Sequence, residues 1–158
     1  GLERFLVMEV LIHHLDTVRR LVGPLRVTAA ALARVSPEIR GEDVAHISLV
    51  SDSGAPGSVA GNFSAAGFPP LPSDRLELVG ERATIRFDAG VLSLSGPAGE
   101  TIRYDFERMV QESYDNAIAH FVECLEGGKP FETDRIDNLN TLRLVADAYR
   151  LAGRRPTP

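Results

Sequence analysis

The chain of 158 residues has 44% hydrophobic and 25% charged side chains, proportions typical of one soluble globular domain and not of a fibrous or disordered protein. Its 22 Asp and Glu residues against 17 Lys and Arg give a formal net charge of −5, which argues against a nucleic-acid-binding surface. The single cysteine, Cys124, cannot form an intrachain disulfide, and no segment approaches the ~20 apolar residues that span a bilayer. We therefore expect a cytoplasmic protein without nucleic-acid or membrane partners.

Hydrophobic spacing divides the first two thirds of the chain into one helix and a series of strands. Between residues 5 and 22 apolar side chains recur every three or four positions, which predicts an amphipathic helix that ends at Gly23. From residue 25 to residue 106 the period is two, which predicts about six or seven strands. Short turns rich in Gly, Pro and Asp separate them, so neighbouring strands are expected to be antiparallel. The alternating positions are Val27, Ala29, Ala31, Ala33, Ala45, Ile47, Leu49, Val59, Gly61, Phe63, Leu76, Leu78, Ala83, Ile85, Phe87, Leu92, Leu94, Ile102 and Tyr104.

The last third of the chain returns to the helical period. An apolar stripe after Phe106 predicts a helix that closes at Gly127 and Gly128, and a final helix is expected from a cap at Thr133 or Asp134 to Gly153. This order predicts an α+β fold, with an open, predominantly antiparallel (mixed) sheet of about six strands and helices packed on one face. Residues 1–153 are expected to form this domain, and residues 154–158 a disordered tail.

The apolar residues on the sheet face opposite the helices predict that this face is an interface with another subunit or domain. By simple alternation Leu32, Val44 and Val50 point away from the side that carries Ile47 and Leu49, so both faces have apolar character. Large, partly apolar open faces are often interfaces with another subunit or domain. We therefore expect a homo-oligomer assembled through the open sheet face, although apolar residues scattered singly need no partner.

The first helix carries the candidate site. At about 100° per residue, Glu9, His13, Asp16 and Arg20 fall within about 60° of one another and form one polar line. A carboxylate one turn before a histidine can orient its ring and favour the imidazolium, as acid–base work near neutral pH requires. We therefore take His13 and Glu9 as candidate catalytic residues, and Asp16 and Arg20 as candidate substrate-binding residues. The alternative is a solvated helix face with ordinary ion pairs.

The other histidines and the cysteine have structural interpretations. His14 falls in the apolar arc of the first helix, which predicts a packed, hydrogen-bonded side chain. His46 and His120 have no obvious acidic or nucleophilic partner in the sequence and are expected to be structural or surface residues, whereas Cys124 is expected to be a small, buried or half-buried side chain. The zinc-protease spacing is absent, and so are a phosphate loop, a nucleophile elbow and a dinucleotide-binding glycine pattern. We expect no metal site and no cofactor-binding element in this chain.

Several of these motifs resemble those of a known family. Residues 8–23, MEVLIHHLDTVRRLVG, resemble the helix that opens the C-terminal half of the Gfo/Idh/MocA oxidoreductases, whose usual pattern is D-x-G-x-H-x-x-D. Residues 137–153 look like the closing helix of that family, and residues 76–87 are similar to one of its strand pairs. The resemblance covers most of the chain.

The resemblance implies an NAD(P)-dependent dehydrogenase that acts on a sugar, cyclitol or related polyol. NAD or NADP would be held mainly by an N-terminal Rossmann domain upstream of Gly1, while this domain would supply the substrate pocket and an open sheet for oligomerisation. In that pattern His13 matches the proton-accepting histidine, Glu9 the acidic residue that is usually Asp, and Asp16 the acid that follows. Leu11 stands where the family usually has glycine. Because the cofactor would be held mainly by the domain upstream of Gly1, the chain alone is not expected to turn over substrate.

Two other hypotheses remain beside the dehydrogenase. The first is a non-catalytic binding or dimerisation module that keeps the fold without the chemistry. The second is a metal-dependent lyase or isomerase site around His13 and Glu9, which would require stoichiometric metal in the purified protein.

Overall fold

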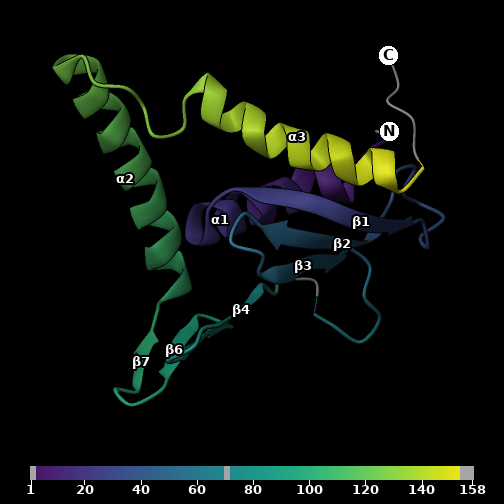
Figure 1. Ribbon diagram of the computed structural model, residues 1–158, viewed down its shortest axis with the longest axis horizontal. Helices are drawn as coiled ribbons and strands as arrows, with labels where there is room; N and C mark the ends of the chain where they lie inside the picture. The colour runs from purple at the N-terminus through teal and green to yellow at the C-terminus, as the bar shows by residue number, and fades with distance from the viewer. Residues whose placement is uncertain (1–2, 70–71, 154–158) are drawn as a thin grey trace. The chain divides into compact units, whose positions relative to one another are not determined.

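The computed structural model describes residues 3–69 and 72–153, and Figure 1 shows the order helix, strands, helices. In chain order the elements are the π-helix η1 (Leu6–Leu11), α1 (Ile12–Val22), β1 (Leu25–Ala33), β2 (Val44–Ser51), β3 (Pro56–Asn62), β4 (Arg75–Val79), β5 (Thr84–Asp88), β6 (Val91–Ser95), β7 (Glu100–Arg103), α2 (Phe106–Gly127) and α3 (Arg135–Leu151). The predicted α+β fold is confirmed, whereas the tail at 154–158 lies outside the described residues. None of the described helices is long and apolar enough to cross a membrane.

The strands form two sheets instead of the predicted single sheet of about six strands. In the described part of the chain, one antiparallel sheet has the order β1-β2-β3 and the other β4-β5-β6-β7. They belong to two compact units, Gly1–Gly67 with Glu132–Pro158 and Phe68–Phe131. Pro69 and Pro72 lie in the connection between β3 and β4 and have no N–H to donate to a ladder, so these positions do not favour a strand that would join the two sheets.

In the first unit, helices cover one face of the three-stranded sheet. η1 packs against β2 and β3, and α3 packs along β1 and α1 (Figure 1). The side chains between them are removed from water, and burying each large apolar one contributes roughly 1.5–3 kcal/mol. The buried cluster consists of Leu6, Val7, Leu11, Leu15, Val27, Ala45, Ile47, Leu49, Val59, Leu144, Val145, Ala148 and Tyr149.

A β-bulge corrects the predicted facing of β1. The register between β1 and β2 shifts between Val27 and Ala29, so the alternation reverses after the extra residue. Leu32 pairs directly with Ala45 and packs against the core, not on the outer face with Val44 and Val50 as simple alternation predicts. The outer face of this sheet therefore carries smaller side chains than the sequence suggests.

The second unit contains an amphipathic sheet and α2. Register places seven apolar side chains on one face of its sheet, while cross-strand ion pairs join Arg75 to Asp88 and Glu77 to Arg86 on the other face. Asp105 caps the start of α2, since its carboxylate accepts a hydrogen bond from the Arg108 N–H. The helix ends at Gly127, before Gly128, where the sequence predicts its end. The apolar face consists of Leu76, Leu78, Ile85, Phe87, Leu92, Leu94 and Ile102.

Candidate functional site

The predicted polar line is interrupted by a change of helix type. Glu9 lies in η1, whereas His13 lies in α1. Hydrogen bonds in a π-helix run from i to i+5, so its turns are wider than those of an α-helix and the 100° spacing does not apply to Glu9. Both side chains are exposed, and within the described residues they form no hydrogen bond or ion pair with each other or with another side chain.

Asp16 belongs to a cluster that joins α1 to α3. Its Oδ1 accepts hydrogen bonds from Thr141 Oγ1 at 2.5 Å and from Arg19 Nη2 at 3.0 Å. Arg19 also donates to both carboxylate oxygens of Asp137, at 2.8 and 2.7 Å, and through Nε to Thr141 at 3.2 Å. We call Asp16, Arg19, Asp137 and Thr141 the α1–α3 cluster. Bidentate geometry fixes a guanidinium more firmly than a single ion pair does, so the cluster sets how the two helices face each other.

Within the α1–α3 cluster, Arg19 and Asp137 each stabilise the charged form of the other. The hydrogen bond to Asp137, opposed by desolvation and reinforced by Asp16, raises the pKa of the Arg19 guanidinium. In turn the hydrogen bond from Arg19 holds the pKa of Asp137 below its usual range. Both groups are therefore charged at neutral pH.

Acidification is expected to weaken the α1–α3 cluster. Because the folded pKa of Asp137 is lowered, its stabilising contribution is present above the unfolded pKa of about 4 and is lost as the pH falls through the folded value. When the pH is lowered below about 4, the melting temperature of the intact protein should decrease. The decrease should be smaller in the Arg19→Met variant than in wild type. Asp43, whose pKa is lowered chiefly by the hydrogen bond from the Val35 N–H, titrates in both proteins and cancels in the comparison. Equal falls in both proteins would contradict the role of this ion pair.

His13 and Asp16 line one shallow depression between α1 and α3. Its volume is about 260 Å³, slightly below the ~300 Å³ at which ordinary small-molecule pockets begin. Glu9 and Arg20 are not among its lining residues. The lining consists of Ile12, His13, Asp16, Asn138, Thr141 and Leu142. Two of the four predicted site residues therefore meet at the same depression, and the other two do not.

Arg20 lies near the end of α1, close to Glu132, the residue at which the chain returns to the first unit. Its Nη2 is 3.7 Å from Glu132 Oε2, and both side chains are about two-thirds or more exposed. An exposed pair at this distance contributes little to stability and leaves the guanidinium accessible.

The part of the site that α3 supplies is not among the residues predicted from the sequence. Asn138 and Thr141 are polar residues three positions apart, and such a pair occupies neighbouring places on one helix face. Thr141 is buried and Asn138 is exposed. This spacing within the apolar pattern of the last helix is the signal that could identify them.

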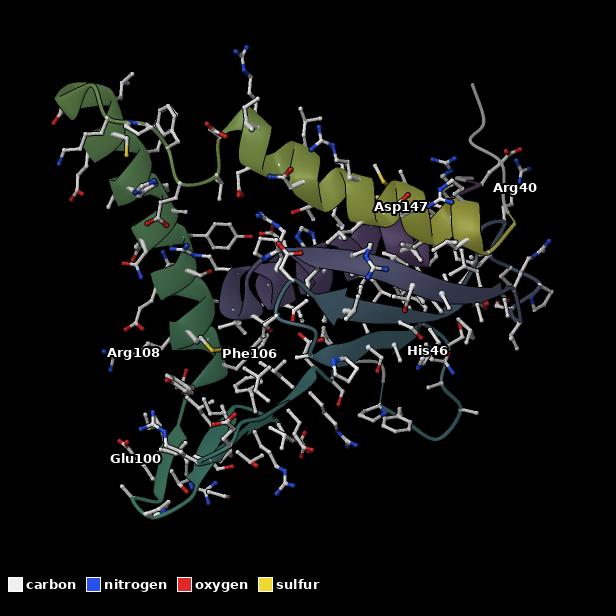
Figure 2. The ribbon with its side chains drawn as sticks, in the orientation of Figure 1. Arg40, His46, Glu100, Phe106, Arg108 and Asp147 are labelled. Carbon is white, nitrogen blue, oxygen red and sulfur yellow. The ribbon has the colours of Figure 1, made fainter. Side chains whose placement is uncertain are left out.

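The remaining candidates behave as structural residues. His14 is half-buried, with Nδ1 3.2 Å from the Val10 carbonyl oxygen, so the predicted packed and hydrogen-bonded histidine is confirmed. Cys124 is buried with Sγ 3.6 Å from His120 Nε2, so the expectation that His120 has no nucleophilic partner is wrong. His46 is exposed on the three-stranded sheet (Figure 2). Across residues 3–69 and 72–153, no three His, Cys, Asp or Glu side chains are grouped as a metal site would require.

An α+β domain with a histidine on its first helix, facing its last helix across a depression, has the architecture expected of the C-terminal half of an oxidoreductase. The family model described as "Oxidoreductase family, C-terminal alpha/beta domain" matches residues 6–156. The chain belongs to this Gfo/Idh/MocA family.

Two relatives and one solved structure match nearly the whole chain. The chain is 33% identical over 162 residues to a D-apiose dehydrogenase of Rhizobium rhizogenes, covering 95% of the chain and 47% of the relative. It is 32% identical over 160 residues to a D-apiose dehydrogenase of Paraburkholderia graminis, covering 93% and 42%. An oxidoreductase from Agrobacterium radiobacter, solved in complex with NAD+, L-tartaric acid and magnesium, superposes with a TM-score of 0.85 at 32% identity, covering 96% of the chain and 48% of that protein. The chain therefore spans about half the length of these relatives.

Proposed function

We propose that the chain is the substrate-binding half of an NAD(P)-dependent dehydrogenase that oxidises a sugar or related polyol, with His13 as the proton acceptor. The observation that carries this proposal is the meeting of His13 and Asp16 at one depression, in a chain 33% identical to a D-apiose dehydrogenase. Because the chain is 33% and 32% identical to two D-apiose dehydrogenases, an aldose of this kind is the first substrate to test.

The described residues do not fit a dinucleotide. Both sheets are antiparallel throughout the described part, and a dinucleotide cradle needs a parallel strand, a glycine-rich turn and a helix N-terminus in succession. We therefore propose that NAD or NADP is bound mainly by an N-terminal domain, and that this chain contributes substrate binding and proton transfer.

The proposed chemistry uses the exposed face of α1. A neutral imidazole at His13 can take the proton of a substrate hydroxyl that is placed within hydrogen-bond reach. The hydrogen bonds from Thr141 and Arg19 to Asp16 both end on Oδ1, so Oδ2 can accept from a second hydroxyl of the substrate. Glu9 and Arg20 remain proposals as the acidic partner of His13 and as a further substrate contact.

We further propose a homo-oligomer formed through open sheet faces. The outer face of β2 carries Val44 and Val50, and the second unit presents its apolar face with an open depression of about 190 Å³. Light scattering at micromolar concentration tests this proposal, and a monomer would contradict it. The composition, with one cysteine, supports a cytoplasmic location.

The proposed function is tested on the intact gene product. Purified protein is mixed with NAD or NADP and a panel of aldoses and polyols that includes D-apiose, and nicotinamide reduction is followed by absorbance. We expect reduction that depends on one of these substrates. Failure to bind either nicotinamide would instead favour a non-catalytic binding or dimerisation module.

A further inference from the structure

The loop before β2 delivers a buried carboxylate to the start of η1. Glu42 is fully buried, and its Oε1 accepts hydrogen bonds from the Phe5 and Val7 N–H groups, each at 3.1 Å. Its own carbonyl oxygen accepts from the Leu6 N–H, also at 3.1 Å. The first N–H groups of a helix have no partner within the helix, and Phe5 provides no side-chain cap. One residue from a distant loop therefore satisfies three successive donors.

A third element holds the same carboxylate from the other side. The hydroxyl of Tyr149 on α3 donates to Glu42 Oε1 at 2.5 Å, and the Arg4 guanidinium lies 4.6 Å from the centre of the Tyr149 ring. Burial, followed by the hydrogen bond to Glu42, raises the pKa of the Tyr149 phenol, so it stays a donor. Three hydrogen bonds therefore converge on one carboxylate oxygen.

The close docking of this loop depends on Gly41. A Cβ at this position would lie 2.6 Å from Phe5 Cβ and 2.9 Å from the Phe5 nitrogen. Such contacts would push Glu42 away from η1. The position of the carboxylate is therefore set by the backbone packing on both sides, not by one flexible side chain.

The conformation of η1 decides where Glu9 lies relative to His13. A π-turn holds more residues than an α-turn, so its presence rotates the residues that precede it relative to α1. Single π-turns are uncommon and often occur at functional sites. If η1 reverted to an α-helix, Glu9 would move around the helix axis relative to His13, and the surroundings of the His13 ring would change.

We propose that Glu42 is a positioning residue. It holds the π-turn of η1 and thereby sets the position of Glu9 relative to His13, the arrangement in which His13 accepts the proton of the substrate. This inference rests on the proposed function of His13. Glu42 does not line the depression; its carboxylate accepts hydrogen bonds from the start of η1 and from Tyr149 on α3, so it acts on His13 from outside the site.

Asp43 provides a matched control. It is also fully buried, it is adjacent in sequence, and it also accepts two backbone hydrogen bonds, from the Val35 and Ser36 N–H groups at 2.7 and 2.6 Å. These bonds hold the loop at Val35 and Ser36 and do not involve η1. Glu42→Gln and Asp43→Asn therefore remove the same charge at the same burial, and only the first changes the anchoring of η1.

The experiment compares both variants in the intact protein by steady-state kinetics and by NMR of ring-labelled histidine, with the His13 signal assigned by its loss in His13→Gln. We expect Glu42→Gln to lower kcat at least tenfold, to change KM less than threefold and to shift the His13 ring signals. Asp43→Asn should keep kcat within twofold and leave those signals in place. Equal loss of kcat in both variants, or unshifted His13 signals in Glu42→Gln, would overturn the proposal.

The same experiment distinguishes a failure of the proposed function from a failure of the Glu42 proposal, and a second variant covers the case in which Glu42→Gln does not fold. If the wild-type protein oxidises no substrate, the proposed function fails, while the His13 signals still decide whether Glu42 positions this residue. If Glu42→Gln does not fold, Tyr149→Phe removes one of the three donors and keeps the two to η1. It should then lower kcat about threefold and shift the His13 signals in the same direction; an unchanged kcat together with unshifted signals would overturn the proposal.

Discussion

Replacing His13 with alanine in the intact protein is expected to lower kcat for sugar oxidation by about two to four orders of magnitude, the usual contribution of a general base. The side chain of His13 is exposed and has no hydrogen bond or ion pair in the described part of the chain, so its loss should not affect folding. The melting temperature should therefore stay within about 1 °C of wild type, as for other surface substitutions. Kinetics and thermal unfolding of the same preparation check both statements.

His46→Ala is the control for the His13 variant. His46 is an exposed histidine of the same unit, on β2 (Figure 2), and it is not among the residues that line the depression. It should keep both the activity and the melting temperature. Unchanged turnover in His13→Ala would remove this residue from the mechanism, and equal losses in the two variants would point to a general effect of histidine removal.

The sequence predicts the ends of the helices well, because local chemistry sets them. Asp134 accepts hydrogen bonds from the Ile136 and Asp137 N–H groups at 2.8 Å, as expected of a helix cap. The first and penultimate helices end at Gly23 and Gly128, where the sequence places their ends. The strands also lie near their predicted positions, since turn residues between them are equally local.

The sequence does not predict features that depend on contacts between distant segments. The bulge between Val27 and Ala29 is followed by a run of alanines, which suit either face of a sheet, so no pattern marks the extra residue. The π-turn of η1 is held by Glu42, 35 positions away from Val7. The residues that α3 contributes to the site are also far in sequence from those of α1, because the hydrogen bond from Thr141 to Asp16 joins residues 125 positions apart.

Leu11 illustrates how a departure from the family pattern can be accommodated. It occupies the position where the pattern usually has glycine, and in the structure it is buried against β3. A Cβ at Gly61 would lie 2.9 Å from Leu11 Cδ2, so the glycine in the facing strand leaves room for the Leu11 side chain. The departure at Leu11 is therefore compatible with an intact core beneath His13.

Gly41→Ala is expected to destabilise the intact protein by about 3 kcal/mol, at the upper end of what added core volume costs. The new Cβ would meet Phe5 Cβ at 2.6 Å and the Phe5 backbone nitrogen at 2.9 Å, and a backbone atom cannot move away by changing rotamer. The loop must then withdraw from η1 and take Glu42 with it. Chemical denaturation measures the loss of stability, and kcat should fall in parallel.

Two other glycines make the Gly41 prediction specific. Gly57 in β3 has open space where a methyl group would stand, so Gly57→Ala should leave stability unchanged or raise it slightly. Gly61→Ala should have an intermediate effect, because the atoms it meets belong to the flexible end of the Leu11 side chain. If Gly41→Ala were as stable and as active as Gly57→Ala, the loop could not be docked on η1 as described. The order of the three variants thus tests whether the anchoring of η1 depends on backbone contact.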